Sequence, residues 1–257
     1  MNFSKIIFSF FLFSSLLFAN EKIITIGLTP NPFENLVEHM REDFKKEGYK
    51  LKIVEFADYI LPNKALSNKE LDANLYQHKP FLDEYNKNAK SDLVATTPIV
   101  IAPMAVFSQK LKNLSELKDG ARIAIPNDPT NESRALELLQ KAGLIKLNDK
   151  VLKTPLDIVD NPKKLKFLEL KAAQLPRALS DVDVAVINSN YALGANLNPV
   201  KDSIFIEDKD SPYVNFVVVR AEDVQSAKTK VIDKVLKSEK LKKFIEENYK
   251  DILIPGF

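Results

Sequence analysis

Residues 22–56, with the sequence KIITIGLTPNPFENLVEHMREDFKKEGYKLKIVEF, contain a helix pattern between two strand patterns. Lys22–Leu28 is a short apolar run typical of a buried strand, and Lys50–Phe56 alternates between apolar and polar residues like a second strand. Phe33–Glu47 has apolar residues at the spacing of an amphipathic helix, which Gly48 can end. This order predicts two parallel strands joined by a crossover helix.

The same alternation continues along the chain. Ala121–Ile125 is a predicted strand, and Thr130–Ala142 is a predicted amphipathic helix. Asp183–Ile187 and Val214–Arg220 are two further apolar strands, and residues 224–249 have a helical pattern. Strands separated by helices predict an α/β fold class, with mostly parallel sheets flanked by helices.

Two polar connections predict that these elements form two lobes rather than one sheet. Residues 111–120 and 208–213 are polar turn-rich segments, at which the chain can cross to a second lobe and return. A ligand would then bind between the lobes, at the carboxyl ends of parallel strands. The expected boundaries are 20–115 plus 218–257 for the first lobe, 120–214 for the second lobe, and crossovers near 116–119 and 215–217.

The first nineteen residues have the three-part layout of a secretory signal peptide. Lys5 supplies the positive start, Ile6–Phe18 is an apolar run that is short for a membrane span, and Ala19 is a small residue at its end. The alternative is that this run forms a buried first helix of the fold. We exclude residues 1–19 from the fold and expect a cleaved signal peptide and export to the periplasm.

The composition limits the classes of protein to consider. A chain of 257 residues, of which 45% are hydrophobic, can bury a sizeable core. The absence of cysteine excludes disulfides and cysteine catalysis, and we expect no lipid anchor, since a lipoprotein anchor needs a cysteine after the signal. The formal net charge is +2 with both signs interspersed, so we expect no nucleic-acid partner.

Sequence motifs of common enzymes are missing. The chain has no HExxH or GxSxG motif, and its 6 glycines leave little room for a phosphate-binding loop. His78, Asp58 and Asp128 are candidate general bases, but nothing places a nucleophilic serine or a second histidine beside them. We expect no catalytic residues, no metal site and no cofactor. An adhesin would show repeats or a surface anchor, and neither is present.

Polar side chains that suit a free amino acid follow several predicted strands. Arg134 lies in the opening turns of a predicted helix, where a guanidinium and free N–H groups can bind a carboxylate. Asn188 and Asn215 can offer amide oxygens to an ammonium group. The alternatives are an exposed ion pair between Arg134 and Glu137 on the helix surface, and an ordinary turn role for Asn188.

Aromatic side chains follow the second strand and occupy a predicted loop at residues 74–80. Tyr59, Tyr76 and His78 can form a polarizable wall, which suits an apolar or thioether side chain. Tyr59 and Tyr76 can instead be packing residues, and His78 can begin a helix with its ring in water.

Seven stretches of the sequence occur in the order of a known family and cover nearly all of the chain after residue 19. By these stretches the sequence resembles the methionine-binding lipoprotein family, also called the NlpA family. They are VEFADYILPN at 54–63, ELDANLYQHKPFL at 70–82, IAIPNDPTNESRAL at 123–136, AQLPRAL at 173–179, AVINSNYA at 185–192, SPYVN at 211–215 and FIEENYKDILIPGF at 244–257.

The resemblance implies a two-lobed type II periplasmic-binding-protein fold and binding of L- or D-methionine for an ABC importer. A methionine-containing dipeptide or another small amino acid is the alternative ligand. The implied partners are this amino acid and the membrane subunits of the importer, and we expect a monomer. By resemblance, Tyr59, Tyr76 and His78 surround the ligand side chain, Asn131 and Arg134 bind its carboxylate, and Asn188 and Asn215 bind its ammonium group.

Three features depart from the family pattern. The family usually has a cysteine at the end of the signal, and this chain has none. Asn31–Phe33 replaces a stretch resembling Gly-Pro-His, and Pro98–Ala105 lacks the histidine and glutamate that often precede its Pro-Met pair. The last two changes can alter the mouth of the pocket or a contact with the importer.

Overall fold

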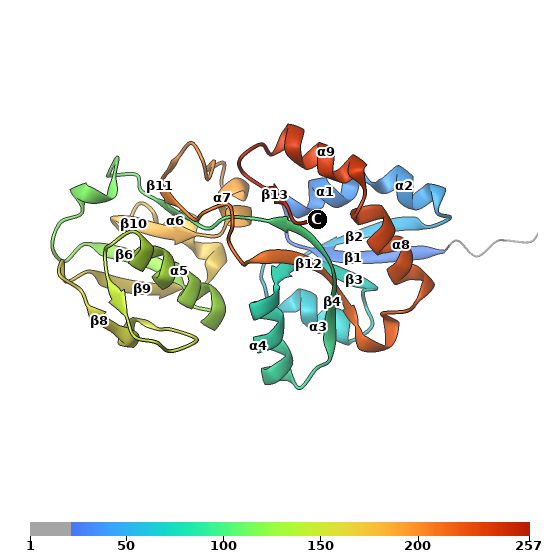
Figure 1. The fold of residues 1–257 in the computed structure, drawn as a ribbon, viewed down its shortest axis with the longest axis horizontal. Helices are drawn as coiled ribbons and strands as arrows, with labels where there is room; N and C mark the ends of the chain where they lie inside the picture. The colour runs from blue at the N-terminus through green and yellow to red at the C-terminus, as the bar shows by residue number, and fades with distance from the viewer. Residues whose placement is uncertain (1–21) are drawn as a thin grey trace, which may run out of the picture.

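The computed structural model describes residues 22–257, so the expected signal peptide at residues 1–19 lies outside the described part of the chain. The described chain forms two lobes, and two extended segments run between them (Figure 1). Each lobe contains a central sheet with helices on both faces, so the two-lobed α/β fold is confirmed.

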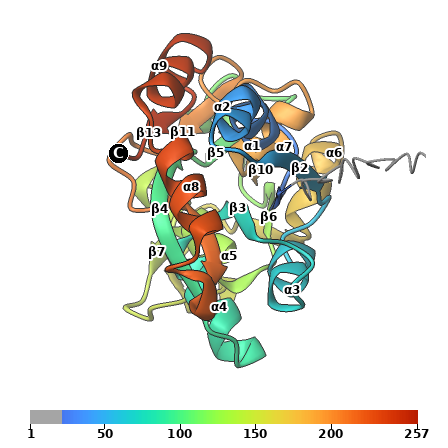
Figure 2. The ribbon, with the colours of Figure 1, turned by 90° about the vertical axis from the view of Figure 1, so that its right-hand side faces the viewer.

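The first lobe is built on a sheet with the strand order β13-β4-β12-β3-β1-β2. Helices α1, α2 and α9 lie on one face and α3 and α4 on the other, while α8 packs with the first group (Figure 2). The strands are β1 (Ile23–Leu28), β2 (Lys50–Glu55), β3 (Ala73–His78), β4 (Leu93–Ile101), β12 (Val214–Arg220) and β13 (Ile254–Pro255), and the helices are α1 (Phe33–His39), α2 (Arg41–Lys46), α3 (Leu61–Ser67), α4 (Lys79–Ala89), α8 (Ala227–Leu236) and α9 (Glu239–Asn248).

Strand β12 shows how the sequence fills both faces of this sheet. Val217 and Val219 pack into the core under α1, α2, α8 and α9, whereas Val218 packs into the core under α3 and α4. Successive side chains of a strand point to opposite faces, so a continuous apolar run is needed where both faces are covered.

The second lobe is built on a sheet with the strand order β11-β5-β10-β6-β9. Helix α5 packs on one face, and α6 and α7 pack on the other. The strands are β5 (Ala105–Phe107), β6 (Arg122–Pro126), β9 (Lys166–Leu170), β10 (Val184–Ile187) and β11 (Ser203–Ile206), and the helices are α5 (Pro129–Lys141), α6 (Leu175–Ala178) and α7 (Ser189–Gly194). A small separate sheet pairs β7 (Lys146–Leu147) with β8 (Ile158–Asp160). Short 3-10 turns occupy Leu114–Glu116, Pro155–Asp157 and Ala172–Gln174 in this lobe and Ala221–Asp223 in the first lobe.

The sheets are mixed, so the expectation of mostly parallel sheets is wrong. Strand β1 is parallel to β2 and β3, but β12 is antiparallel to both β3 and β4. In the second lobe, β6 is parallel to β9 and β10, whereas β5 is antiparallel to β10 and β11. The chain leaves the first lobe at the end of β4 and re-enters it at the start of β12. Because these two strands are neighbours in the sheet, they must run in opposite directions.

The chain crosses between the lobes at 102–104 and 207–213, which corrects the expected crossovers near 116–119 and 215–217. On the way out, Pro103 lies between β4 in the first sheet and β5 in the second. At the return, Val214 already pairs with Ile101 of the first sheet. The first lobe therefore comprises 22–101 and 214–257, and the second comprises 105–206.

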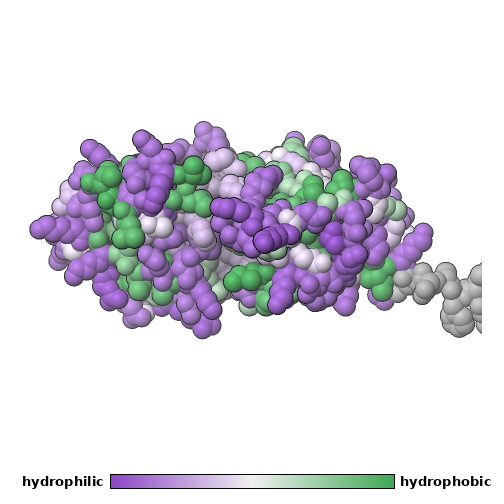
Figure 3. Space-filling model, turned by 90° about the horizontal axis from the view of Figure 1, so that it is seen from below, coloured by the Kyte–Doolittle hydropathy of each residue, from purple (hydrophilic) through white to green (hydrophobic). Residues whose placement is uncertain are grey.

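The surface seen in Figure 3 is mostly hydrophilic, with hydrophobic residues in small separate patches over both lobes. Within residues 22–257, no helix combines the length and the apolar character that crossing a membrane requires.

Candidate functional site

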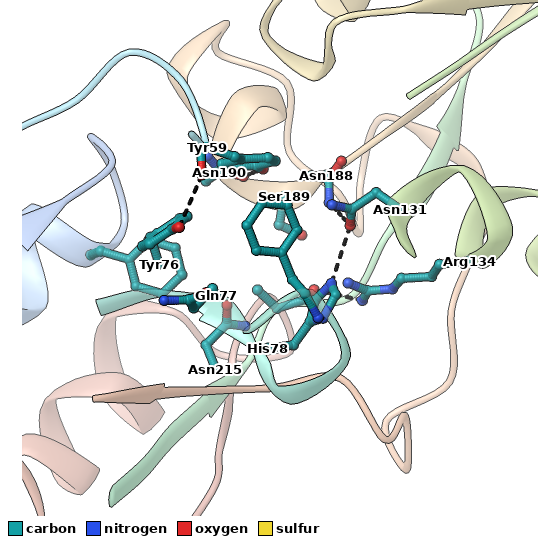
Figure 4. A pocket seen from close by; sticks show the side chains of 13 residues that line it. Tyr59, Tyr76, Gln77, His78, Asn131, Arg134, Asn188, Ser189, Asn190 and Asn215 are labelled. Carbon is teal, nitrogen blue, oxygen red and sulfur yellow. Dashed lines mark hydrogen bonds between the residues drawn. The ribbon is translucent and has the colours of Figure 1, made fainter. Parts of the chain in front are cut away.

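A small pocket lies between the two lobes and is lined by residues of both. The structure brings all seven residues that were predicted from the sequence to its wall (Figure 4). The lining residues are Phe33, Tyr59, Tyr76, Gln77, His78, Phe81, Ala102, Asn131, Arg134, Asn188, Ser189, Asn190 and Asn215.

Strand β3 contributes the floor of the cavity from the first lobe. Tyr76, Gln77 and His78 are consecutive buried residues at its carboxyl end, and Asn215 of β12 pairs directly with His78 in the antiparallel ladder. The sequence placed Tyr76 and His78 in a loop. They lie on a strand instead, which fixes their side chains more firmly than a loop would.

The second lobe contributes residues from two helix starts. Asp128 caps α5 by accepting a hydrogen bond from the backbone N–H of Asn131, and Arg134 follows one turn later. Asn188 occupies the N-cap position of α7 at the end of β10, but its side chain makes no capping hydrogen bond. In Figure 4, Asn131 and Asn188 lie across the cavity from Tyr76 and Gln77, and Arg134 lies beside His78.

Arg134 is buried, with 3% of its surface exposed, and its ion-pair partner is Glu207 rather than Glu137. Nε donates to one carboxylate oxygen of Glu207 at 2.9 Å, and Nη2 donates to the other oxygen and to the carbonyl of Ala102 at 3.1 Å. The guanidinium also lies over the ring of Tyr213, 4.3 Å from its centroid. The alternative of an exposed pair with Glu137 is therefore wrong.

This pairing changes what Arg134 can offer to a ligand. The edge formed by Nε and Nη2 is taken by Glu207, whereas Nη1 makes no hydrogen bond with any residue of the described chain. A ligand carboxylate at this site would meet Nη1, because the guanidinium makes its bidentate contact with Glu207.

Asn131 is the centre of a polar network between the lobes. Its Oδ1 accepts hydrogen bonds from Nε2 of His78 at 3.2 Å and from Nδ2 of Asn188 at 2.8 Å. Its Nδ2 donates to both carboxylate oxygens of Asp128, at 2.9 and 3.1 Å. Burial raises the pKa of Asp128. Asn131 thus connects a residue of the first lobe to two residues of the second.

His78 is the N-cap residue of α4, so it does begin a helix, but its ring is buried and neutral in this network rather than in water. Its Nδ1 accepts a hydrogen bond from the backbone N–H of Phe81 at 3.2 Å, so Nε2 carries the proton and donates to Asn131. Burial, followed by the nearby charge of Arg134, lowers the pKa of His78 to about 3. The imidazole adds no positive charge to the cavity near neutral pH.

Asn188 has an acceptor that no residue of the described chain uses. Its Nδ2 donates to Asn131, but its Oδ1 is buried without a hydrogen-bond partner among residues 22–257. A buried oxygen without a partner is costly, so a site that leaves one open is suited to a ligand that donates to it.

Three rings form an aromatic wall in the first lobe. The centroids of Tyr59, Tyr76 and Phe81 lie 5.9 to 6.0 Å apart. The hydroxyl of Tyr59 donates to Asn190 at 2.6 Å and that of Tyr76 donates to the carbonyl of Tyr59 at 2.9 Å, so the polar ends of both rings have partners. Burial raises the pKa of both hydroxyls well above the usual range.

Sequence reasoning missed six lining residues. Phe81 follows His78 by one helical turn, and Asn190 belongs to the same short stretch as Asn188, so spacing could have indicated both. Phe33 and Ala102 belong to the two stretches, Asn31–Phe33 and Pro98–Ala105, that depart from the family pattern and were expected near the mouth of the pocket. Gln77 and Ser189 carry no comparable local signal.

Comparison with known proteins identifies the family. The model of the NlpA lipoprotein family matches residues 24–257, nearly the whole described chain. The chain belongs to the NlpA lipoprotein family. This is a family of substrate-binding proteins, and within residues 22–257 no group of three or more histidine and acidic side chains is placed to hold a metal ion.

Relatives within the NlpA lipoprotein family are similar over most of their length. The D-methionine-binding lipoprotein MetQ of Salmonella typhi is 51% identical over 203 residues, which cover 77% of this chain and 75% of the relative. A nutrient binding protein from Burkholderia cenocepacia, whose structure is bound to methionine, is 45% identical with a TM-score of 0.88, covering 91% of this chain and 100% of the other. A periplasmic substrate-binding protein of an ABC transporter from Coxiella burnetii is 40% identical with a TM-score of 0.87, covering 90% of this chain and 99% of the other.

Proposed function

We propose that this protein is a substrate-binding protein that captures methionine between its lobes and delivers it to an ABC importer. The observation that carries this proposal is a single cavity that combines a buried guanidinium, an unpaired buried amide oxygen and an aromatic wall. A free amino acid with an apolar side chain needs one group of each kind. The names of the relatives, which include methionine binders, support the same ligand.

The carboxylate is assigned to Arg134. Its Nη1 is the free donor on a cation held in place by Glu207, and a buried charge-assisted hydrogen bond is stronger than one between neutral groups. Asn131 was expected to share this role, but its Nδ2 group is hydrogen-bonded to both carboxylate oxygens of Asp128. We assign Asn131 a positioning role, because it orients His78 and Asn188 around the ligand.

The ammonium group is assigned to the free Oδ1 of Asn188, with Asn215 as a second contact from the opposite lobe. The Nδ2 group of Asn215 faces the carbonyls of Val100 and Tyr213 at 3.4 and 3.5 Å, so its oxygen is the atom left for a donor. Two neutral amide oxygens can pair a cation without adding a buried negative charge.

The methionine side chain is assigned to the wall formed by Tyr59, Tyr76 and Phe81, with His78 at its edge. A thioether makes favourable contacts with aromatic rings at about 5 Å. Because His78 is neutral, it presents a polarizable ring and no charge to this apolar group.

The setting of this function is also part of the proposal. We infer that the protein acts as a monomer in the periplasm, after export directed by residues 1–19, and docks on the membrane subunits of an importer. Relatives are named lipoproteins and one is named a periplasmic protein of an ABC transporter. Release by osmotic shock would support a freely diffusing protein, and acylation would contradict it.

Mass spectrometry of small molecules released from the purified protein tests the ligand directly. We expect methionine, unmodified and in a ratio near one to one. Calorimetry with L-methionine, D-methionine and a methionine dipeptide then ranks the ligands. Tightest binding of the dipeptide or of another amino acid would replace methionine in the proposal, and chemical turnover of a bound molecule would contradict a purely binding role.

A further inference from the structure

Glu207 holds Arg134 from the side away from the cavity. Its carboxylate receives the Nε and Nη2 hydrogens of Arg134, and only 12% of the side chain is exposed. Glu207 does not line the ligand cavity. It lies in a second cleft, which it shares with Arg134, Glu137 and Tyr213.

The same two residues tie together both segments that join the lobes. In the outgoing segment, the backbone N–H of Met104 donates to the Glu207 carboxylate at 3.1 Å, and the carbonyl of Ala102 accepts from Arg134 at 3.1 Å. Glu207 itself begins the returning segment, where its backbone N–H donates to the carbonyl of Met104 at 2.9 Å. The ion pair thus connects α5 to residues 102–104 and 207.

Any rotation of one lobe against the other must occur through these two segments. Because both are hydrogen-bonded to the Arg134–Glu207 pair, the position of the guanidinium and the arrangement of the segments depend on each other. A ligand carboxylate on Nη1 would then favour one arrangement of the joining segments over others, which is what a coupling between binding and lobe closure requires.

We propose that Glu207 is a positioning residue for ligand binding, which acts through Arg134 and couples the cavity to the segments that join the lobes. This inference rests on the proposed function, since it needs a ligand with a carboxylate. Glu207 sets the plane of the guanidinium and leaves Nη1 as the donor for the ligand. It also balances the charge of Arg134, so the pair is neutral before a zwitterion enters.

Two substitutions of Glu207 distinguish an effect on the position of Arg134 from an effect of the carboxylate charge alone. Glu207→Gln removes the charge and turns one acceptor into a donor that faces Arg134, whereas Glu207→Asp keeps the charge but is too short to retain all its contacts with Arg134 and Met104. We expect both to weaken methionine binding, by about tenfold or more for Glu207→Gln. If only charge mattered, Glu207→Asp would bind like the parent and Glu207→Gln would bind the carboxylate more tightly, and this result would overturn the proposal.

A double-mutant cycle tests whether Glu207 acts through Arg134. In the Arg134→Lys background the paired contacts are already lost, so Glu207→Gln should cost less affinity than it does in the parent. An equal loss in both backgrounds would show that the two residues act independently and would refute the coupling. The matched control is Asp208→Asn, because Asp208 is the next residue along the chain and forms an exposed pair with Lys141.

The measurements also separate this inference from the proposed function. Thermal unfolding of each variant distinguishes loss of folded protein from loss of affinity, and X-ray scattering with and without methionine reports closure. We expect the Glu207 variants to fold and to close less completely. A parent protein that does not bind methionine would refute the proposed function, whereas a binding parent with unchanged Glu207 variants would refute only the role of Glu207.

Discussion

The hydroxyl of Tyr59 donates a 2.6 Å hydrogen bond to Oδ1 of Asn190, and the two residues belong to different lobes. A second bond runs beside it, from the hydroxyl of Tyr191 to the backbone carbonyl of Ala57 at 3.1 Å. Tyr59 also belongs to the aromatic wall of the cavity. The ring that would contact the ligand is therefore also the ring that fastens the lobes together.

Ligand binding should bring the lobes together, because residues from both of them surround one cavity. We expect small-angle scattering to show a smaller radius of gyration at saturating methionine than without it. Identical compactness in the two conditions would contradict this prediction.

Removing the hydroxyl of Tyr59 should weaken binding while leaving the aromatic wall in place. A typical hydrogen bond contributes about 0.5–1.5 kcal/mol, so Tyr59→Phe should reduce affinity by roughly 2- to 12-fold. Calorimetry measures this change. Tyr85→Phe is the control, because Tyr85 does not line the cavity and packs within the first lobe. Equal effects of the two substitutions would argue against a role for the bond between lobes.

Arg134→Ala should remove most of the affinity for methionine. It takes away the charged partner of the ligand carboxylate and leaves Glu207 buried without its cation, which should cost about 2–5 kcal/mol of binding. Arg134→Lys should recover only part of the affinity, because a point charge cannot reproduce the planar contacts with Glu207. Lys141→Ala is the control on the same helix, since Lys141 is half-exposed and pairs with Asp208. Wild-type affinity in Arg134→Ala would eliminate this residue from the site.

Asn188→Ala should weaken binding by removing the acceptor for the ammonium group. Hydrogen bonds to charged groups contribute about 1.5–3 kcal/mol, which corresponds to roughly 10- to 150-fold in affinity. Asn248→Ala, on the exposed face of α9, should leave binding unchanged. N-acetylmethionine lacks the ammonium group, so it should bind weakly to the parent and lose little further affinity in Asn188→Ala. A large loss for both ligands would point to a structural role for Asn188.

Glu132→Gln should stabilise the protein more as the pH rises. Glu132 is 6% exposed, and its Oε1 has no partner among the described residues. Burial, followed by the charges of Glu169, Asp128 and Asp157, raises its pKa from 4.5 to about 7. Between these values the folded protein holds a proton that the unfolded chain releases, so this group lowers stability as the pH rises.

The difference in free energy of unfolding between Glu132→Gln and the parent should therefore be near zero below pH 4.5. It should grow to about 3 kcal/mol at most above pH 7. Urea unfolding at several pH values measures it, and the contributions of titrating groups that do not interact with Glu132 cancel because both proteins contain them. A difference that does not change with pH would contradict the assignment.

Local sequence patterns predicted the elements whose burial follows a regular period. The strand expected at Val214–Arg220 is β12 with the same ends, and the helix expected from Thr130 begins at Pro129. Strand β3 escaped prediction because its polar residues suggested a loop. Asn74 and Gln77 are buried there, and both donate to Oδ1 of Asn63, so their polarity is satisfied inside the lobe rather than by water.

The sequence by itself determined the α/β class, the two lobes, the family resemblance and the residue types at the cavity, because these depend on periodicity and on motifs of adjacent residues. Only the tertiary structure decided that β4 and β5 belong to different sheets and that Arg134 pairs with Glu207, 73 positions away, rather than with nearby Glu137. Contacts between distant residues depend on how the chain crosses between the lobes. A local pattern does not contain that path, because it records only neighbours along the chain.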